Sequence, residues 1–278
     1  MPLTFKQEFQ LKNFKFNYSP VNHFFESPWL PTPVVILYRS VFALYSLSWI
    51  VYRLIADEKF RQKVTFFYVT NWSYLALIIY FLVSSVVTIF EYIKRRRRQV
   101  HTTDTERGHV HASDGQARWF HMIQWFWYSI AATMAIGVTL FFWLFDYDGM
   151  GITLSDVNVH LLNAVFMIID HALSCMPVRL FHMVYPMIFV SLYMIATVLY
   201  WAFISKDYIY KMMDYNTNPG VAVGLLLAAM LIAAPLIHSL YYGTYRLREY
   251  VAAKTRKAES KEPEREMEEK EMEENEVA

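Results

Sequence analysis

The stretch VTFFYVTNWSYLALIIYFLVSSVVTIF, residues 64–90, contains no Asp, Glu, Lys or Arg. A helix needs about 20 apolar residues to cross the hydrocarbon core of a bilayer. Residues 119–145, 180–205 and 215–245 are free of the same charged side chains. A soluble protein would need a very large core to hide four such blocks, so they predict membrane-spanning helices.

Two further segments are weaker candidates, because each carries ionisable side chains. Residues 33–55 include Arg39, and residues 157–178 include His160 and Asp170. We predict that both cross the membrane, which makes the fold an all-α polytopic bundle of six transmembrane helices. The predicted spans lie at about 33–55, 65–90, 120–145, 157–178, 182–205 and 219–242.

The basic residues predict the orientation. If the N-terminus lies inside, most Lys and Arg fall on inside segments, including a run of five consecutive cations, and cytosolic loops carry such an excess. Both termini are therefore predicted to be cytosolic. Residues 1–32 would be a cytosolic or interfacial segment, 33–245 the transmembrane domain, and 246–278 a charged, disordered tail, with a solvated helix as the alternative.

The cationic run also suggests a partner. It acts most simply as a topology signal, and a second interpretation is a site for anionic lipid head groups. Because the charge sits in loops between apolar blocks, nucleic acid is not a predicted partner. The run comprises Lys94, Arg95, Arg96, Arg97 and Arg98.

The cysteine and histidine residues argue against two other classes of protein. The single cysteine, Cys175, excludes an intrachain disulfide. On the predicted topology His121, His182 and His238 all lie near the inner face, so the outer histidine pair of a two-haem electron carrier is missing. One inner haem or metal site stays open, but we predict neither a cofactor nor a metal.

The topology brings two reactive side chains to one depth. Thr70 lies about one turn into the second predicted span and His160 about one turn into the fourth, so both lie roughly 5–6 Å below the outer interface. A hydroxyl and an imidazole on neighbouring helices could form a nucleophile and its base. The alternative is two unrelated polar residues near the head groups.

Asp170 follows His160 by ten residues, which places it near the bilayer midplane. A charged side chain there costs at least about 2.5–3.5 kcal/mol on insertion scales, so it should face the bundle and have a partner. His171 and Arg39 are candidate partners, and a neutral carboxyl is another solution. Both a functional role and a structural clasp between helices remain open.

Several short motifs occur together along the chain. They are FKQEFQLKNF at the N-terminus, SPW at Ser27–Trp29, LYR at Leu37–Arg39, YVTNW at Tyr68–Trp72, then NAVFMIID, MPVR, and MVYP at Met183–Pro186. Together they resemble the rolling-stone family of invertebrate membrane proteins. The resemblance covers nearly the whole chain except the basic loop and the acidic tail, and YVTNW is its most specific part.

The rolling-stone family is similar to the androgen-induced membrane proteins, some of which hydrolyse fatty acid esters of hydroxy fatty acids with an intramembrane Thr and His. Matched by motif, these fall on Thr70 and His160. The resemblance thus implies a threonine-type lipid-ester hydrolase. Asn71 would help to stabilise an oxyanion, and Asp170 would support the surroundings of the histidine.

This sequence also departs from the hydrolase pattern. Asn71 stands where those hydrolases have Phe, and Leu161 stands where they have Thr. The rolling-stone name is tied to myoblast fusion, so the alternative is a non-enzymatic membrane protein acting in cell fusion or adhesion. Membrane lipids are the expected partners, and the plasma membrane or the endoplasmic reticulum is the expected location.

Overall fold

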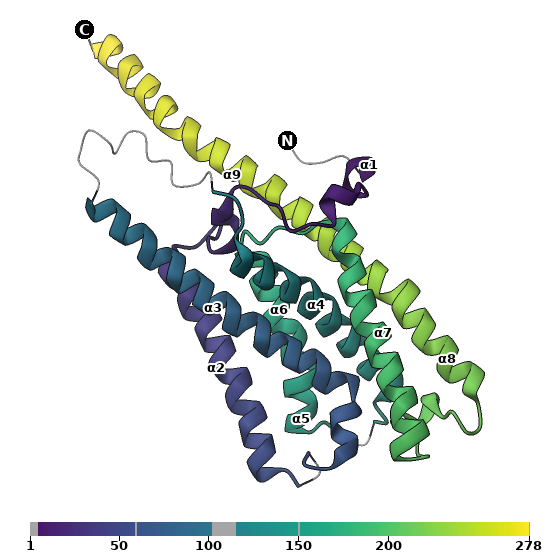
Figure 1. Cartoon of the computed structure of the whole chain (residues 1–278). Helices are drawn as coiled ribbons and strands as arrows, with labels where there is room; N and C mark the ends of the chain where they lie inside the picture. Colours follow the sequence, from purple (N-terminus) through teal and green to yellow (C-terminus); the bar gives the residue numbers. More distant parts are fainter. Residues whose placement is uncertain (1–4, 59, 102–114, 150, 278) are drawn as a thin grey trace.

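The fold is known from a computed structural model that describes residues 5–58, 60–101, 115–149 and 151–277. Within these residues the regular structure is entirely helical (Figure 1). The α-helices are α1 (Phe5–Glu8), α2 (Thr32–Ala56), α3 (Val69–His101), α4 (Trp119–Phe141), α5 (Leu154–Asp156), α6 (Asn163–Leu173), α7 (Val184–Leu199), α8 (Pro219–Ala228) and α9 (Ala234–Val277).

Shorter helical turns extend or join these elements. Four π-helical segments continue an α-helix: η4 (Phe142–Asp146), η5 (Val157–Leu162), η7 (Tyr200–Ile204) and η9 (Ala229–Ala233). Five are 3₁₀ turns: η1 (Leu11–Asn13), η2 (Val21–Phe24), η3 (Lys63–Phe67), η6 (Leu180–Met183) and η8 (Lys211–Met213).

Five helices among the described residues are long and apolar enough to cross a membrane. The segment that carries His160 and Asp170, residues 154–173, is not among them, because polar side chains interrupt its apolar sequence. It lies within the bundle as α5, η5 and α6. The five candidate spans are Thr32–Ala56, Val69–Gln99, Trp119–Asp146, Leu180–Ile204 and Pro219–Thr255.

Two element boundaries differ from the sequence predictions. α3 begins at Val69, after a 3₁₀ turn, and continues to His101 through the cationic run. α9 continues through the acidic tail to Val277. Both extensions are rich in Lys, Arg and Glu, which have high helix propensity.

The N-terminal segment, residues 5–31, packs across one end of the bundle (Figure 1). Phe24 and Phe25 are buried in the core, and Arg179 donates to the backbone oxygens of Lys15 and Asn17. Burial raises the pKa of Glu8 above its ordinary value. The segment therefore does more than lie at the membrane interface, because its aromatic side chains reach the interior.

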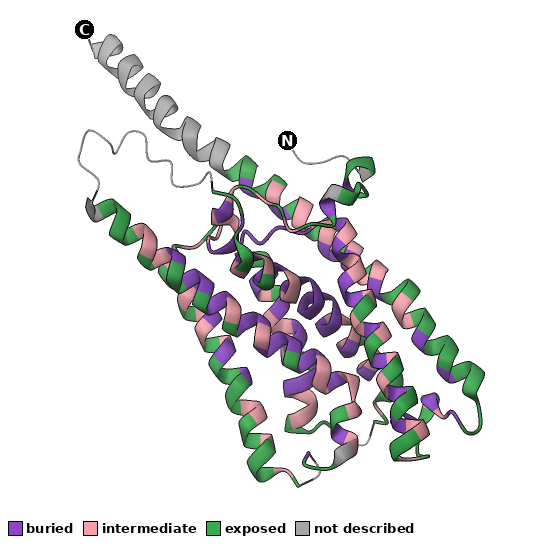
Figure 2. Ribbon diagram, in the orientation of Figure 1, coloured by how far each residue is buried: buried purple, intermediate pink, exposed green. Residues whose placement is uncertain are grey.

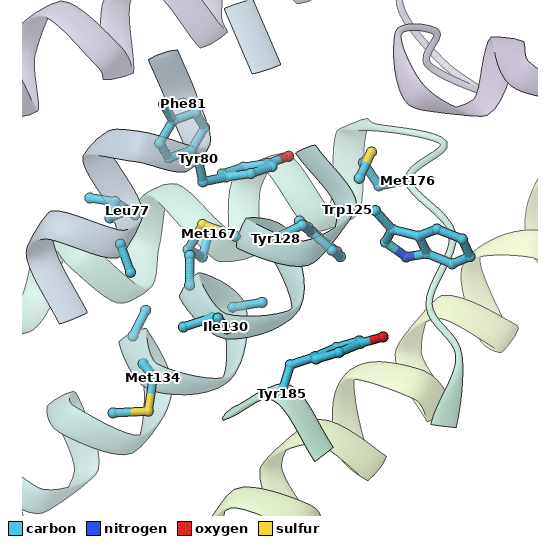
Figure 3. Packing of buried hydrophobic residues seen from close by; sticks show 14 of the residues in the cluster. Leu77, Tyr80, Phe81, Trp125, Tyr128, Ile130, Met134, Met167, Met176 and Tyr185 are labelled. Atoms are coloured by element: carbon cyan, nitrogen blue, oxygen red, sulfur yellow. The ribbon is translucent and has the colours of Figure 1, made fainter. Parts of the chain in front are cut away.

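The core lies around α3 and α4, with α6 beside them (Figure 2). In the apolar part of each helix, 61% of residues are buried in α3 but only 22% in α2. The peripheral helices therefore turn apolar side chains such as Leu37 and Leu44 outward, as expected for a surface that faces lipid. Figure 3 shows Tyr80, Tyr128 and Met167 packed together in the interior.

The packing of the N-terminal segment predicts a stability effect. Replacing Phe24 by alanine should lower the free energy of unfolding by about 3–5 kcal/mol, because the fully buried ring leaves a cavity. Phe203→Ala is the matched control, since 82% of Phe203 is exposed. Denaturation in detergent micelles measures both values, and equal destabilisation would contradict the burial of Phe24.

Candidate intramembrane polar site

Asp170 on α6 accepts hydrogen bonds from three side chains in the interior. The Arg39 Nε donates to Asp170 Oδ1 at 2.9 Å, and neither side chain is exposed. The Tyr38 hydroxyl donates to the same oxygen at 2.9 Å, and the Tyr80 hydroxyl donates to Oδ2. Tyr38, Arg39, Tyr80 and Asp170, here called the Asp170 cluster, join α2, α3 and α6.

The guanidinium of Arg39 extends these contacts to other elements. Its Nη1 donates to the Phe24 carbonyl at 3.0 Å and to the Thr88 hydroxyl at 2.9 Å. Gln124 on α4 donates to the same Phe24 carbonyl at 2.9 Å and to the Ser84 hydroxyl at 2.9 Å. The Phe24 carbonyl thus ties the N-terminal segment to α2 and α4, and the same two side chains also contact α3.

The sequence left two candidate partners for Asp170, and the structure selects Arg39. His171 instead contacts the Tyr128 hydroxyl through Nδ1 at 2.6 Å and the Thr244 hydroxyl through Nε2 at 2.8 Å. Its backbone oxygen accepts a hydrogen bond from Arg248. His171 therefore links α6 to α4 and α9 rather than completing the Asp170 cluster.

Thr70 and His160 are both buried, each with 8% exposure. Ser73 and Asn163, one turn further along their respective helices, are joined by a hydrogen bond of 3.0 Å from the Asn163 amide to the Ser73 hydroxyl. Thr70 at the start of α3 and His160 in η5 therefore lie at a similar level of the bundle. Within the described residues no hydrogen bond joins the Thr70 hydroxyl to the His160 ring.

The surroundings of His160 leave one ring nitrogen unused. The ring stacks on Phe142, with 3.7 Å between centroids, and the Thr139 hydroxyl donates to the His160 backbone oxygen. The Nδ1 atom is buried and has no hydrogen-bond partner among the described residues. A buried imidazole nitrogen with no partner can still accept or donate a proton.

Two other side chains lie near Thr70. The Asn71 amide donates to the Thr65 carbonyl at 2.7 Å, which holds the 3₁₀ turn before α3. The Tyr210 hydroxyl faces Thr70 but without the geometry of a hydrogen bond. Burial raises the pKa of Tyr210, so this phenol stays protonated. No sequence pattern marked Tyr210, because it lies in an irregular loop between α7 and α8.

An apolar cavity of about 490 Å³ opens between α4, α7, α8 and the start of α9, here called the lateral cavity. Val69 and Tyr210, which flank Thr70, line it, as do the exposed residues Leu144 and Ile232. Neither Thr70 nor His160 is among its described lining residues. Its size and apolar lining suit an acyl chain entering sideways from the bilayer.

The inner histidines do not form a metal centre in the described part of the chain, where no group of three or more His, Cys, Asp or Glu side chains has suitable geometry. His238 contacts the Thr133 hydroxyl at 3.2 Å and the Arg179 carbonyl at 3.0 Å. His121 and His182 are buried among aromatic rings.

The fold and this site define a polytopic α-helical membrane protein built around buried polar contacts. The chain belongs to the rolling stone family, since the family described as "Protein rolling stone" matches residues 2–258. It is similar to Protein rolling stone of Drosophila melanogaster, with 27% identity over 263 residues covering 88% of this chain and 90% of the fly protein. No solved structure matches the chain significantly. The resemblance predicted from the sequence is confirmed.

The Arg39–Asp170 pair predicts non-additive effects on stability. Arg39→Met and Asp170→Leu should each cost about 3–5 kcal/mol, because each leaves one charge buried without its partner. The double variant should lose less free energy of unfolding than the two single variants lose together, since it removes both charges. Unfolding of the four proteins in micelles measures the coupling, and simple additivity would contradict the ion pair.

Proposed function

We propose that this rolling stone family member is an intramembrane lipid-ester hydrolase with Thr70 as nucleophile and His160 as general base. The observation that carries the proposal is the buried, unpartnered Nδ1 of His160 at the level of the Thr70 hydroxyl. A base of this kind is needed because a threonine hydroxyl is a weak nucleophile until its proton is removed. A substrate or one water between the two side chains would pass the proton from the hydroxyl to the ring nitrogen.

The proposed reaction has two halves. The Thr70 oxygen attacks the ester carbonyl carbon while its proton passes to His160 Nδ1. The carbon–oxygen bond of the ester then breaks, and the departing alkoxide takes that proton to leave as an alcohol. Water next attacks the acyl carbon of the acyl-threonine and gives one proton to the same nitrogen. The bond between that carbon and the Thr70 oxygen then breaks, the Thr70 oxygen takes the proton back from His160, and the fatty acid leaves.

Two groups could stabilise the oxyanion formed in each half. The N-terminus of α3 lies at Val69 and Thr70 and carries the partial positive charge of a helix start. The protonated Tyr210 hydroxyl is a second donor. Asn71 is less suited, because its amide already donates to Thr65. Asp170 would act indirectly, by holding α6.

Access and topology are consistent with a lipid substrate. The lateral cavity would receive an acyl chain beside Val69 and Tyr210. We further infer that residues 154–173 form a sixth crossing, since about 20 helical residues span about 30 Å. Both termini would then be cytosolic, in the plasma membrane or the endoplasmic reticulum.

A fluorophosphonate probe tests the proposed nucleophile directly. The purified wild-type protein should become covalently labelled, and Thr70→Ala and His160→Ala should reduce labelling at least about 10³-fold, because each removes one member of the pair. Thr70→Ser should retain labelling, since it keeps the hydroxyl. Ser85→Ala is the matched control, because Ser85 is an equally buried hydroxyl on the same helix.

Labelling that persists in Thr70→Ala would contradict Thr70 as the nucleophile. The hydrolase proposal would be excluded if the folded wild-type protein is not labelled and does not hydrolyse fatty acid esters of hydroxy fatty acids. Melting temperatures of all variants show whether a loss of labelling reflects a loss of fold.

The role proposed for Tyr210 predicts a separate kinetic effect. Tyr210→Phe should slow labelling by about 10²-fold, which is typical for removal of one oxyanion donor. Stability should change little, because phenylalanine keeps the ring contacts with Tyr68 and Phe141. The labelling rate and the melting temperature are measured together, and an unchanged rate would exclude Tyr210 from the site.

A further inference from the structure

A second cavity, of about 240 Å³, lies at the opposite end of α3 from Thr70, where α3 ends and α4 begins. Its wall carries four cations and one carboxylate, that of Glu91. It is here called the basic pocket, and its charged or titratable lining residues are Glu91, Lys94, Arg95, Arg98, Arg118 and His121. The excess of positive charge favours an anionic ligand.

The four cations of the basic pocket come from α3 and from the residue before α4. Lys94 contacts Glu91 at 3.0 Å, and Arg95 is paired with Glu26 on the N-terminal segment. Arg98 on α3 and Arg118, the N-cap residue of α4, are both exposed. Both line the pocket, and guanidinium groups suit the planar, two-oxygen recognition of a phosphate.

His121 supplies an independent reason to expect a ligand. Its side chain is 1% exposed, and its Nδ1 accepts a hydrogen bond from the Arg118 backbone N–H at 3.1 Å. A neutral ring that accepts at Nδ1 carries its hydrogen on Nε2. That Nε2 has no hydrogen-bond partner within the described chain, and the Glu91 oxygen is 3.7 Å away.

A buried donor without an acceptor is costly, so the ring is suited to an acceptor oxygen that enters the pocket. We propose that the basic pocket binds a phosphate monoester group, with Arg98 and Arg118 as the charged contacts and His121 Nε2 as the buried donor. This site is separate from the proposed hydrolase site.

The surroundings of the basic pocket favour a phosphate carried by a lipid. Trp119 is 70% exposed beside it, and Phe90 and Ile93 are exposed on the adjacent face of α3. The candidate spans Val69–Gln99 and Trp119–Asp146 end and begin at this level. A head group in the pocket would therefore leave its acyl chains against an apolar, aromatic surface at the membrane boundary.

Binding of dioctanoyl phosphatidic acid to the purified full-length protein, measured by native mass spectrometry, tests the proposal. The Arg98→Gln/Arg118→Gln variant should bind at least about tenfold more weakly than wild type, because it loses two charge-assisted contacts. The matched control is Arg96→Gln/Arg97→Gln, which removes the same charge from exposed positions that do not line the pocket. It should bind within about twofold of wild type.

His121→Phe gives a second test of the pocket's interior. Phenylalanine retains the ring packing against Phe24 and Phe120 but removes the Nε2 donor. Phosphatidic acid binding should therefore weaken. If His121→Phe does not fold, the Arg98→Gln/Arg118→Gln variant still tests the pocket. Dioctanoyl phosphatidylcholine, whose phosphate is a diester, should bind weakly to all proteins.

Competition with inorganic phosphate distinguishes the source of the ligand. If phosphatidic acid binds tightly and only high concentrations of inorganic phosphate displace it, the site is assigned to a lipid. Inorganic phosphate binding as tightly as the lipid, and lost in Arg98→Gln/Arg118→Gln, assigns it to a free phosphate. Equal losses in the pocket variant and its control, or no preference over phosphatidylcholine, would overturn the proposal.

Discussion

A guanidinium and a carboxylate meet in the interior of the bundle, where water cannot solvate either charge. Each charge alone would cost several kcal/mol in such surroundings, so Arg39 and Asp170 require one another. Association of helices in lipid gains little from the hydrophobic effect, and polar contacts therefore contribute strongly to their orientation. α2 buries few residues, and the Asp170 cluster determines which of its faces turns inward. The same guanidinium holds the N-terminal segment through the Phe24 carbonyl.

Much of this architecture could be predicted from the sequence. Blocks without charged residues marked the long helices, and α2 at Thr32–Ala56 lies within one residue of its predicted bounds at either end. The partner of Asp170 could not be chosen in advance, because the sequence does not show how α2 is rotated about its axis. Tyr38 and Tyr80 were missed for the same reason. The packing of the N-terminal segment was also missed, since its aromatic residues follow no regular period.

The candidate sites also contain some features that the sequence predicted and others that it did not. Topology alone predicted that Thr70 and His160 lie at one depth, because depth depends only on counting residues along a helix. Tyr210 could not be predicted, since it reaches Thr70 from a loop without regular structure. The cationic run was recognisable as a row of like charges. Its assembly with Arg118 and His121 into a pocket required the arrangement of α3 beside α4.

The central claim is that the Arg39–Asp170 pair holds α2 against α6. It is tested most directly by the distance between spin labels on lipid-facing Leu37 and Ile168, in a Cys175→Ser background, measured by double electron–electron resonance. The wild-type pairing predicts one narrow distance distribution, which should broaden or shift when Asp170 is replaced by asparagine. An unchanged narrow distribution after that replacement would contradict the claim.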